Sequence, residues 1–334
     1  MNKDIYFTKE YAALNEMIEE GEAEFFELKT KNGHISDSYI KRKIDTTIDG
    51  RTYYDAVSAY GYGGPIVHET TDLKALIEDF RIFAEAYCEA NHIVSSFIRF
   101  HPVFNNQEPL KEIYDISYIR DTVGTVLNTY GDTFQTQFSS TARNKVRKRL
   151  KDNHFSCHVN RGFQDIETFI DIYRCTMNRH NADYFYYFKD DYFYRMRDLF
   201  KDDVMTVSIK YDDEVIAMGL YLLSGDIIHD HLNGTRREYL KYSPAYLLKY
   251  TALNWGEENG YRLIHYGGGV SNSSDDPVLK FKKRFSGETS FKYCIGKKIW
   301  NHSVYKKLIR KAGANPNSHF FPAYRDGRVE AVSK

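Results

Sequence analysis

The segment 143-RNKVRKRLK-151 concentrates positive charge, and only Asp152 opposes it. On a helix these cations point to all sides, so they cannot face a core; they are either solvated or bound to phosphates. Phosphate binding would suit the pyrophosphate of coenzyme A or of a nucleotide-sugar, or the backbone of a transfer RNA. Arg143 and Arg147, together with Arg236 further along the chain, are the candidate phosphate ligands. A solvated helix face remains the alternative interpretation.

Two histidines lie near the end of a predicted strand, in 229-HDHLN-233. Strand alternation places His229, His231 and Asn233 on one face and Asp230 on the other. A His-x-His pair can bind metal, but no third ligand follows at a recognisable spacing, so we expect no metal site. His231 is a candidate general base that removes a proton from an ammonium group, and a buried, hydrogen-bonded histidine is the alternative.

A second basic segment, 280-KFKKRF-285, follows the acidic loop 274-SDDP-277. If the segment is a strand, alternation places Lys280, Lys282 and Arg284 on one face and the two phenylalanines on the other. An amphipathic edge strand with a solvated basic face would explain this pattern without any function. The sequence has no G-x-S-x-G or HExxH motif, so nothing indicates a serine nucleophile or a zinc protease.

Composition limits the classes of partner. The 334 residues include 46 Lys and Arg and 46 Asp and Glu, so no overall field attracts DNA or an anionic membrane. The four cysteines are far apart, in no metal-ligand or disulfide pattern, which indicates a reducing compartment. The N-terminal segment lacks a signal-peptide pattern, and no window is apolar enough to span a bilayer. We expect a cytoplasmic chain that is not an integral membrane protein.

The elements that must position these residues follow from hydrophobic periodicity. Helices are predicted over 72–91, 139–153, 164–180, 189–200 and 244–260. Strands are predicted over 24–29, 96–106 with a break at Pro102, 113–119, 122–129, 204–211, 214–223, 227–234 and 261–269. A meander of strands, then a helix, then a strand parallel to the last of them indicates an α+β fold of mixed, mostly antiparallel sheets flanked by helices.

Several short motifs occur in an order that resembles one protein family. They are 60-YGYGGP-65, 98-IRFHPVFNN-106, 143-RNKVRKRLK-151, 169-FIDIYRCTMNRHNADYFYYF-188, 229-HDHLNGT-235, 267-GGG-269 and 280-KFKKRF-285. Together they resemble the FemAB-like branch of the GNAT acyltransferase superfamily, which includes peptidoglycan bridge-forming peptidyltransferases and relatives with a BioF2-like acetyltransferase domain. The resemblance implies two tandem GNAT-like lobes, residues 1–130 and 131–334, the second being BioF2-like. No stretch sustains enough heptads for a coiled-coil arm.

The resemblance also implies roles for residues in the second lobe. The Phe-Lys pair of the peptidyltransferases falls on Phe281 and Lys282, and the lysine would stabilise developing negative charge or the phosphate end of the donor. Arg179 matches the arginine that binds the acceptor's phosphate, and Tyr184 lies close enough to share that pocket. A structural ion pair for Arg179 and ordinary packing for Tyr184 are the alternatives.

In the first lobe, polar and aromatic residues flank turns. The glycines of 60-YGYGGP-65 indicate a tight turn that brings the backbone close to a neighbour, taken here to be the other lobe. The resemblance makes this turn a wall of the acceptor cleft. The candidate acceptor ligands are Tyr60 and Tyr62 as stacking surfaces, Asp55 as a carboxylate for the amine, and His101 and Asn105 beside the turn at Pro102.

These observations predict an N-acyltransferase of cell-envelope biogenesis. The acceptor would be a small-molecule amine, nucleotide-linked or lipid-linked, on an amino sugar or a peptidoglycan stem peptide. The preferred donor is acyl-coenzyme A, because the coiled-coil arm of some peptidyltransferases is missing, and aminoacyl-tRNA is the close alternative. The glycine-rich pyrophosphate signature of classical GNAT enzymes is missing from 234-GTRREYLKYSP-244, which leaves the donor open. A non-catalytic carbohydrate- or nucleotide-binding module that retains the fold is the alternative.

Overall fold

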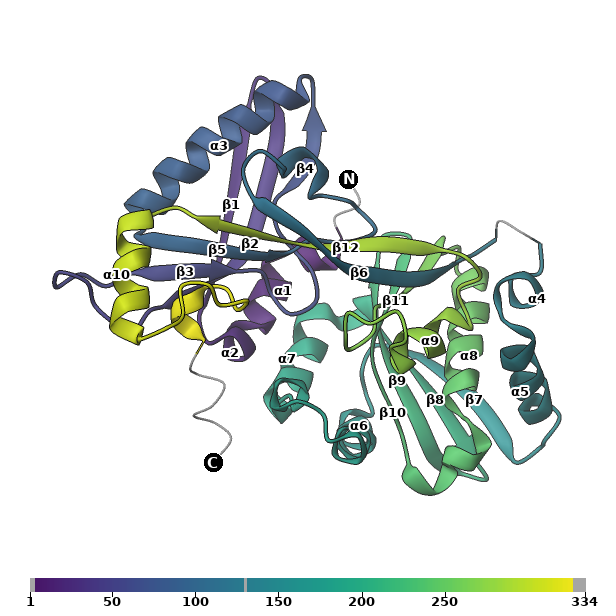
Figure 1. The fold of residues 1–334 in the computed structure, drawn as a ribbon. Helices are drawn as coiled ribbons and strands as arrows, with labels where there is room; N and C mark the ends of the chain where they lie inside the picture. The colour runs from purple at the N-terminus through teal and green to yellow at the C-terminus, as the bar shows by residue number, and fades with distance from the viewer. Residues whose placement is uncertain (1–3, 129–130, 327–334) are drawn as a thin grey trace. The chain divides into compact units, whose positions relative to one another are not determined.

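The computed structural model describes residues 4–128 and 131–326, which divide into two units (Figure 1). The first unit contains Tyr6–Ile119 and the chain from Lys292 onward, and the second contains Arg120–Phe291 with Asp4 and Ile5. The predicted boundary at residue 130 differs from this division. The chain enters the second unit within one strand, β6, and returns to the first within another, β12, so the C-terminal segment packs with the N-terminal half.

The first unit is built on an antiparallel sheet with one parallel pair. Its strand order is β1-β2-β3-β5-β12, and β4 pairs with β2. Because α3 connects β4 to β5, β5 can lie parallel to β3. The strands are β1 (Glu22–Thr30), β2 (Gly33–Lys43), β3 (Tyr54–Val57), β4 (Ile66–Thr70), β5 (Ile93–Arg99) and β12 (Ser290–Ile299). The helices are α1 (Lys9–Leu14), α2 (Glu16–Glu19), α3 (Leu73–Ala90) and α10 (His302–Ala312).

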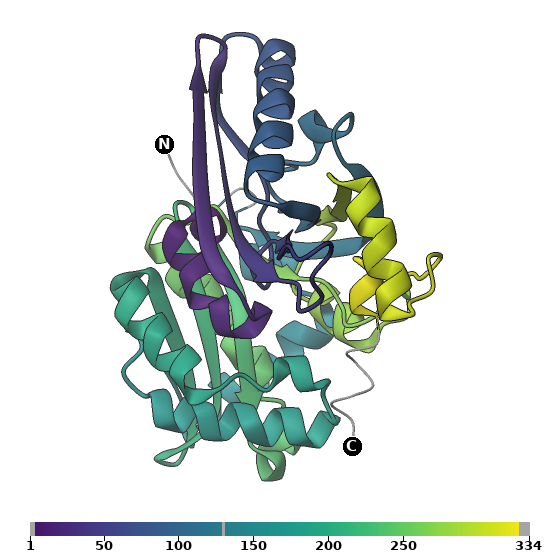
Figure 2. The same ribbon diagram turned by 90° about the vertical axis from the view of Figure 1, so that its left-hand side faces the viewer.

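The long helix α3 confirms the periodicity of residues 72–91. Its buried face comprises Leu76, Phe80, Ala84 and Cys88, at helical spacing. The Asp72 side chain caps its first turn by accepting a hydrogen bond from the Ala75 amide at 3.0 Å. Figure 2 shows α3 running alongside the long strands β1 and β2.

The second unit carries a six-stranded sheet in the order β6-β11-β10-β9-β8-β7. Only β10 and β11 are parallel, so the sheet is mostly antiparallel as predicted. Its strands are β6 (Asp115–Val126), β7 (Phe155–Arg161), β8 (Val204–Tyr211), β9 (Glu214–Ser224), β10 (Ile227–Thr235) and β11 (Leu263–Gly267). Its helices are α4 (Thr133–Gln137), α5 (Ser140–Leu150), α6 (Ile166–His180), α7 (Asp190–Phe200), α8 (Ala245–Glu258) and α9 (Pro277–Lys283).

Helices cover this sheet on both faces (Figure 1). The helix α6 packs on β9 and β10, and α7 packs on α6. On the other side, α8 packs on β7, β8 and β9, and α5 packs on α8. The predicted meander, helix and parallel strand are therefore all confirmed in the second unit.

Two sequence predictions were wrong in detail. Residues 280–285 are not a strand. Asp276 and Pro277 begin the helix α9, and the last residues of this helix are 280–283. The predicted strands 113–119 and 122–129 form one strand, β6, which ends at Val126; residue 129 lies outside the described residues. Across 4–128 and 131–326, none of the helices has both the length and the hydropathy required to span a bilayer.

Candidate active site

The central strands of the second unit separate beside the candidate lysine. The parallel pairing of β10 with β11 stops at His229 opposite His265, although β10 continues to Thr235. A β-bulge lies at His231. Asp230 pairs with Tyr221 and Leu232 pairs with the adjacent Leu220, so His231 is the extra residue of β10 in this register. The strict alternation predicted for this strand is therefore wrong from His231 onward. Beyond His229 the facing edges of the two strands no longer pair with each other.

A glycine loop follows the end of β11 and is held by Lys282 and Arg120. The loop begins at Gly267, whose φ is 72°. The Lys282 Nζ donates a hydrogen bond to the Gly268 carbonyl at 2.7 Å, and the Arg120 guanidinium donates to the Gly269 carbonyl at 2.6 Å. Lys282 is half-buried and projects from α9. Its ammonium group is therefore fixed next to the backbone that emerges where β10 and β11 separate.

Asp276 joins this loop to the start of α9, and sequence reasoning missed it. One carboxylate oxygen accepts the amides of Val278 and Leu279, both at 2.9 Å, and the other accepts the amides of Val270 and Ser271 at 3.0 and 2.8 Å. The residue is buried. A Cβ added to Gly269 would lie 2.3 Å from this carboxylate, so only glycine permits the close approach. The signal in the sequence was Asp followed by Pro, a helix start.

A buried ion pair lies in the same lobe. The Lys249 ammonium of α8 contacts the Asp230 carboxylate of β10, and their side chains are 2% and 1% exposed. The other Asp230 oxygen has no hydrogen-bond partner among the described residues. Sequence reasoning missed this pair, because Lys249 sits within an apolar helix face and Asp230 between two histidines.

Burial and this pair set the charge of Lys282. The pKa of Lys282 is lowered to about 8, mainly by burial; the charges of Lys249 and Arg120 also lower it, while those of Asp230 and Asp276 raise it. At pH 7 the lysine is still mostly protonated, because its pKa lies about one pH unit above 7. It can therefore present a positive charge at neutral pH and lose that charge under mildly basic conditions.

The candidate base His231 forms a hydrogen bond inside the second unit. Its Nε2 is 2.8 Å from the Tyr192 hydroxyl. Burial, with a contribution from His229, lowers its pKa to about 3. A histidine with this pKa holds a proton too weakly to take one from an alkylammonium group. The structure thus favours the alternative of a buried, hydrogen-bonded histidine.

Three predicted acceptor and phosphate residues of the second unit have different surroundings. Arg179 donates to the Thr235 carbonyl at 2.8 Å, at the end of β10, and burial lowers its pKa. Tyr184 is 74% exposed and free to meet a ligand. Arg236 pairs with Asp171 at 2.8 Å. Of these residues, Tyr184 exposes the largest surface, and the binding roles of all three stay predictions.

Some cations of α5 form hydrogen bonds to neighbouring residues, and others are exposed to solvent. Arg143 donates to the backbone carbonyls of Gln135 and Phe138, and Arg147 donates to the Gln135 side chain at 2.6 Å and lies over Phe134. Lys148 is exposed. The two predicted phosphate ligands therefore already tie α5 to α4, and their phosphate role stays a prediction. Phe281 packs edge-on against Tyr246 and Phe285.

In the first unit, Asp55 lies in a buried charge cluster. Its carboxylate accepts hydrogen bonds from Arg42 at 2.7 Å, Arg325 at 2.5 Å and the Tyr324 hydroxyl at 3.1 Å. The side chain is 1% exposed. Two guanidinium groups thus neutralise it, which explains its burial without an acceptor amine.

The turn at 60–65 is tight, and its neighbour is β5 of the same unit. Gly61 and Gly64 have φ of 89° and 87°, and a Cβ on Gly64 would lie 2.5 Å from the Ile98 side chain. Within the first unit the turn therefore packs on β5, and the expectation that it meets the other lobe stays a prediction. The Tyr11 hydroxyl donates to the carbonyl of Tyr60 at 2.9 Å.

Asn106, rather than the predicted Asn105, anchors this region. Its side chain accepts from the His101 amide at 2.8 Å and donates to the carbonyls of Gly63 and Pro65 at 3.0 and 3.1 Å. Asn105 adopts a left-handed conformation, with φ of 48°. The rings of Tyr62 and His101 lie 5.0 Å apart. The turn, His101 and Tyr62 thus form one packed group, whose role toward an acceptor stays a prediction.

Comparison with known proteins identifies the fold around Lys282. The acetyltransferase (GNAT) domain family matches residues 136–283. The UDP-N-acetylmuramoylpentapeptide-lysine N(6)-alanyltransferase of Weissella viridescens is 23% identical over 176 residues, which are 52% of this chain and 51% of that protein. Residues 136–283, less than half of the chain, thus match a GNAT domain, and the similarity to the alanyltransferase agrees with the FemAB-like resemblance. It spans about half the length of the curated relative that it matches.

The likeness to solved structures extends over nearly all of the chain. FemX superposes with a TM-score of 0.68 at 13% identity, covering 92% of this chain and 94% of that one. A tandem GNAT protein from the clavulanic acid biosynthesis pathway superposes with a TM-score of 0.50 at 9% identity, covering 84% and 83%. The predicted α+β fold of two tandem GNAT-like lobes is confirmed.

Proposed function

We propose that the chain is an N-acyltransferase that moves an aminoacyl or acyl group onto an amine of a cell-envelope precursor. The observation that carries the proposal is Lys282, a cation fixed beside diverging strands in a GNAT domain. The curated relative is named as an alanyltransferase acting on the lysine of a UDP-linked muramoyl-pentapeptide. The acceptor proposed for this chain belongs to the same class, an amine on a nucleotide-linked or lipid-linked peptidoglycan precursor.

In this mechanism Lys282 stabilises the oxyanion. When an amine attacks an ester or thioester carbonyl, negative charge gathers on the carbonyl oxygen, and a preorganised cation lowers the energy of that state. The hydrogen bond to Gly268 and the loop held by Asp276 fix the lysine before the reaction. His231 takes no part as a base, because its pKa is about 3. The acceptor amine would lose its proton to solvent or to the other substrate.

We favour aminoacyl-tRNA as the donor and keep acyl-coenzyme A as the second candidate. The alanyltransferase likeness supports the first. The GNAT domain supports the second in general terms. The loop between β10 and α8, where the sequence lacks the glycine-rich signature, is filled by a short 3-10 helix over Arg237–Tyr242. Because aminoacyl-tRNA and acyl-coenzyme A are both found in the cytoplasm, the proposed reaction would take place there.

The proposal can be tested by incubating the purified chain with each donor and one acceptor. The donors are alanyl-tRNA, seryl-tRNA and acetyl-coenzyme A, and the acceptor is UDP-N-acetylmuramoyl-pentapeptide with a lysine at the third position. Mass spectrometry of the acceptor should show one added acyl group with one of them. Stabilisation by the acceptor without any product would instead indicate a non-catalytic binding module of the same fold. No product and no stabilisation with any of them would refute the proposal for this acceptor.

A further inference from the structure

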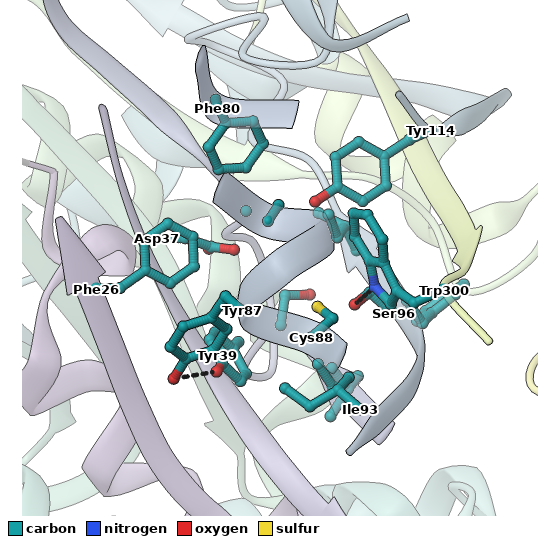
Figure 3. A pocket seen from close by; sticks show the side chains of 17 residues that line it. Phe26, Asp37, Tyr39, Phe80, Tyr87, Cys88, Ile93, Ser96, Tyr114 and Trp300 are labelled. Atoms are coloured by element: carbon teal, nitrogen blue, oxygen red, sulfur yellow. Dashed lines mark hydrogen bonds between the residues drawn. The ribbon is translucent and has the colours of Figure 1, made fainter. Parts of the chain in front are cut away.

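A small cavity lies in the core of the first unit, between α3 and the sheet (Figure 3). Its volume is about 30 Å³, enough for about two water-sized groups. Its walls are mainly aromatic and aliphatic, with Phe26, Tyr39, Phe80, Tyr87, Tyr114 and Trp300 among them. It is separate from the features of the GNAT domain described above, because every lining residue belongs to the first unit.

One acid faces this cavity. Asp37 lies on β2 opposite Phe26 of β1, and Figure 3 shows its carboxyl group pointing into the space. The residue is 8% exposed, and its Oδ1 has no hydrogen-bond partner in the part of the chain that the structure describes. The lining residues include no lysine, arginine or histidine. Asp55, another buried acid of this unit, differs because two arginines neutralise it.

Such a group is unfavourable in an empty core. A buried polar atom without a partner costs about 1–3 kcal/mol, and a buried, unpaired charge costs far more. Burial raises the pKa of Asp37 well above its ordinary value, although a hydrogen bond from the Ser38 backbone opposes the shift, so this environment favours the uncharged acid. It also raises the pKa of Cys88 to about 12 and that of Tyr114 well above its ordinary value. Burial thus disfavours a negative charge on each of these three groups, and no lysine, arginine or histidine lines the cavity.

We propose that this cavity binds a primary ammonium group. The aromatic rings of Phe26 and Phe80, which line the cavity, can attract a cation through their quadrupoles. The Asp37 carboxylate and the Tyr114 hydroxyl, which both face the cavity, can accept its N–H donors. The two heavy atoms of methylammonium match the available volume, and a longer amine would need the half-buried Phe26 and Tyr87 to move aside.

Binding exchanges one cation for one proton. The ammonium ion enters with its charge, the Asp37 carboxylic acid releases its proton to solvent, and the site then holds an ammonium-carboxylate pair. The affinity should therefore rise about tenfold per pH unit while the free acid remains protonated. The titratable neighbours of Asp37 include Cys88 of α3, Tyr39 and Tyr114, and burial raises the pKa of each of them. The Tyr39 hydroxyl donates a hydrogen bond to the Tyr87 hydroxyl at 3.0 Å.

The test uses ¹³C-methylammonium chloride and the intact chain. Isothermal titration and NMR line broadening should show saturable binding at a Kd of the millimolar order, below roughly 100 mM ligand. Two additives should not compete with methylammonium for the site. They are sodium chloride at equal ionic strength and methanol, which is a neutral molecule of the same size. Asp37→Asn resembles the neutral acid in shape, so it should fold and bind at least about tenfold more weakly. The exposed Asp115→Asn is the matched control and should bind like the parent.

Three results would overturn the proposal. They are binding no stronger than that of sodium, equal binding by the Asp37→Asn variant, and an affinity independent of pH. If Asp37→Asn does not fold, Tyr114→Phe replaces it, and binding unchanged in that variant would count against the proposal in the same way. A crystal structure of the protein grown in the presence of methylammonium would also refute the proposal if it showed only water beside Asp37. None of these results depends on transferase activity, so failure here leaves the proposed function untouched.

Discussion

Lys282 should lose its proton well before an ordinary lysine. Its pKa is lowered from 10.5 to about 8, with burial as the largest cause. At pH 7 about 9% of a lysine with a pKa of 8 is neutral, against about 0.03% at a pKa of 10.5, a ratio of about 300. The neutral amine is the reactive form toward an acylating reagent. Lys282 should therefore be labelled far faster than its modest exposure would suggest.

Competitive labelling with trace acetic anhydride measures this difference without a substrate. Peptide mass spectrometry follows Lys282 across pH 6 to 11, with the exposed Lys148 of α5 as an internal reference. Labelling of Lys282 should rise with a midpoint near pH 8. In Lys249→Met the midpoint should move upward, because the Lys249 charge lowers the pKa of Lys282. A midpoint at the ordinary lysine value in the parent chain would refute the burial argument.

The same pKa predicts a pH limit on catalysis. Because the protonated lysine stabilises the oxyanion, the rate should fall as the pH rises through about 8. The lowered pKa also means that the unfolded chain holds this proton more tightly than the folded one. Folding stability should therefore increase with pH between about 8 and 10.5, through this group. Lys282→Arg, which stays charged, should lose both effects.

Three further substitutions test the supporting structure. Lys249→Met should lower the free energy of unfolding in urea by about 3–5 kcal/mol, since it leaves Asp230 as a buried uncompensated charge, and adding Asp230→Leu should recover most of the loss. Gly269→Ala should lower both the melting temperature and transfer activity, because its Cβ would lie 2.3 Å from Asp276; normal values in the variant would contradict the packing described. Asp55→Ala should cost about 3–5 kcal/mol in the same unfolding assay because it leaves two arginines without their partner. Unchanged unfolding would show that Asp55 is not a structural charge.

The order of elements could be predicted because local periodicity determines it. The helices α3 and α6 each carry a buried face at helical spacing, and the strands β8 and β9 are apolar runs that are buried over most of their length. The end of the chain could not be placed in this way. The pairing of β12 with β5 joins residues nearly two hundred positions apart, and no local pattern specifies such a contact.

The candidate site was only partly accessible from the sequence. The motif likeness predicted Lys282, but the strand expected for 280–285 was wrong, although Asp276 and Pro277 are a recognisable helix start. The bulge at His231 inserts one residue into β10, and periodicity cannot anticipate it. The buried acids Asp37 and Asp230 were missed because a polar residue in a strand pattern reads as exposed. Their environments are created by packing between distant segments.

The central claim is that Lys282 drives acyl transfer, and the most direct test compares two neighbouring lysines. Single-turnover transfer of labelled alanine from alanyl-tRNA to UDP-N-acetylmuramoyl-pentapeptide would be measured at pH 7 for the parent chain, Lys282→Met and Lys283→Met. Lys283 is exposed on the same helix and serves as the matched control. The account predicts a loss of about 10²–10³-fold for Lys282→Met and near-parental rates for Lys283→Met. Equal rates in all three proteins would contradict it.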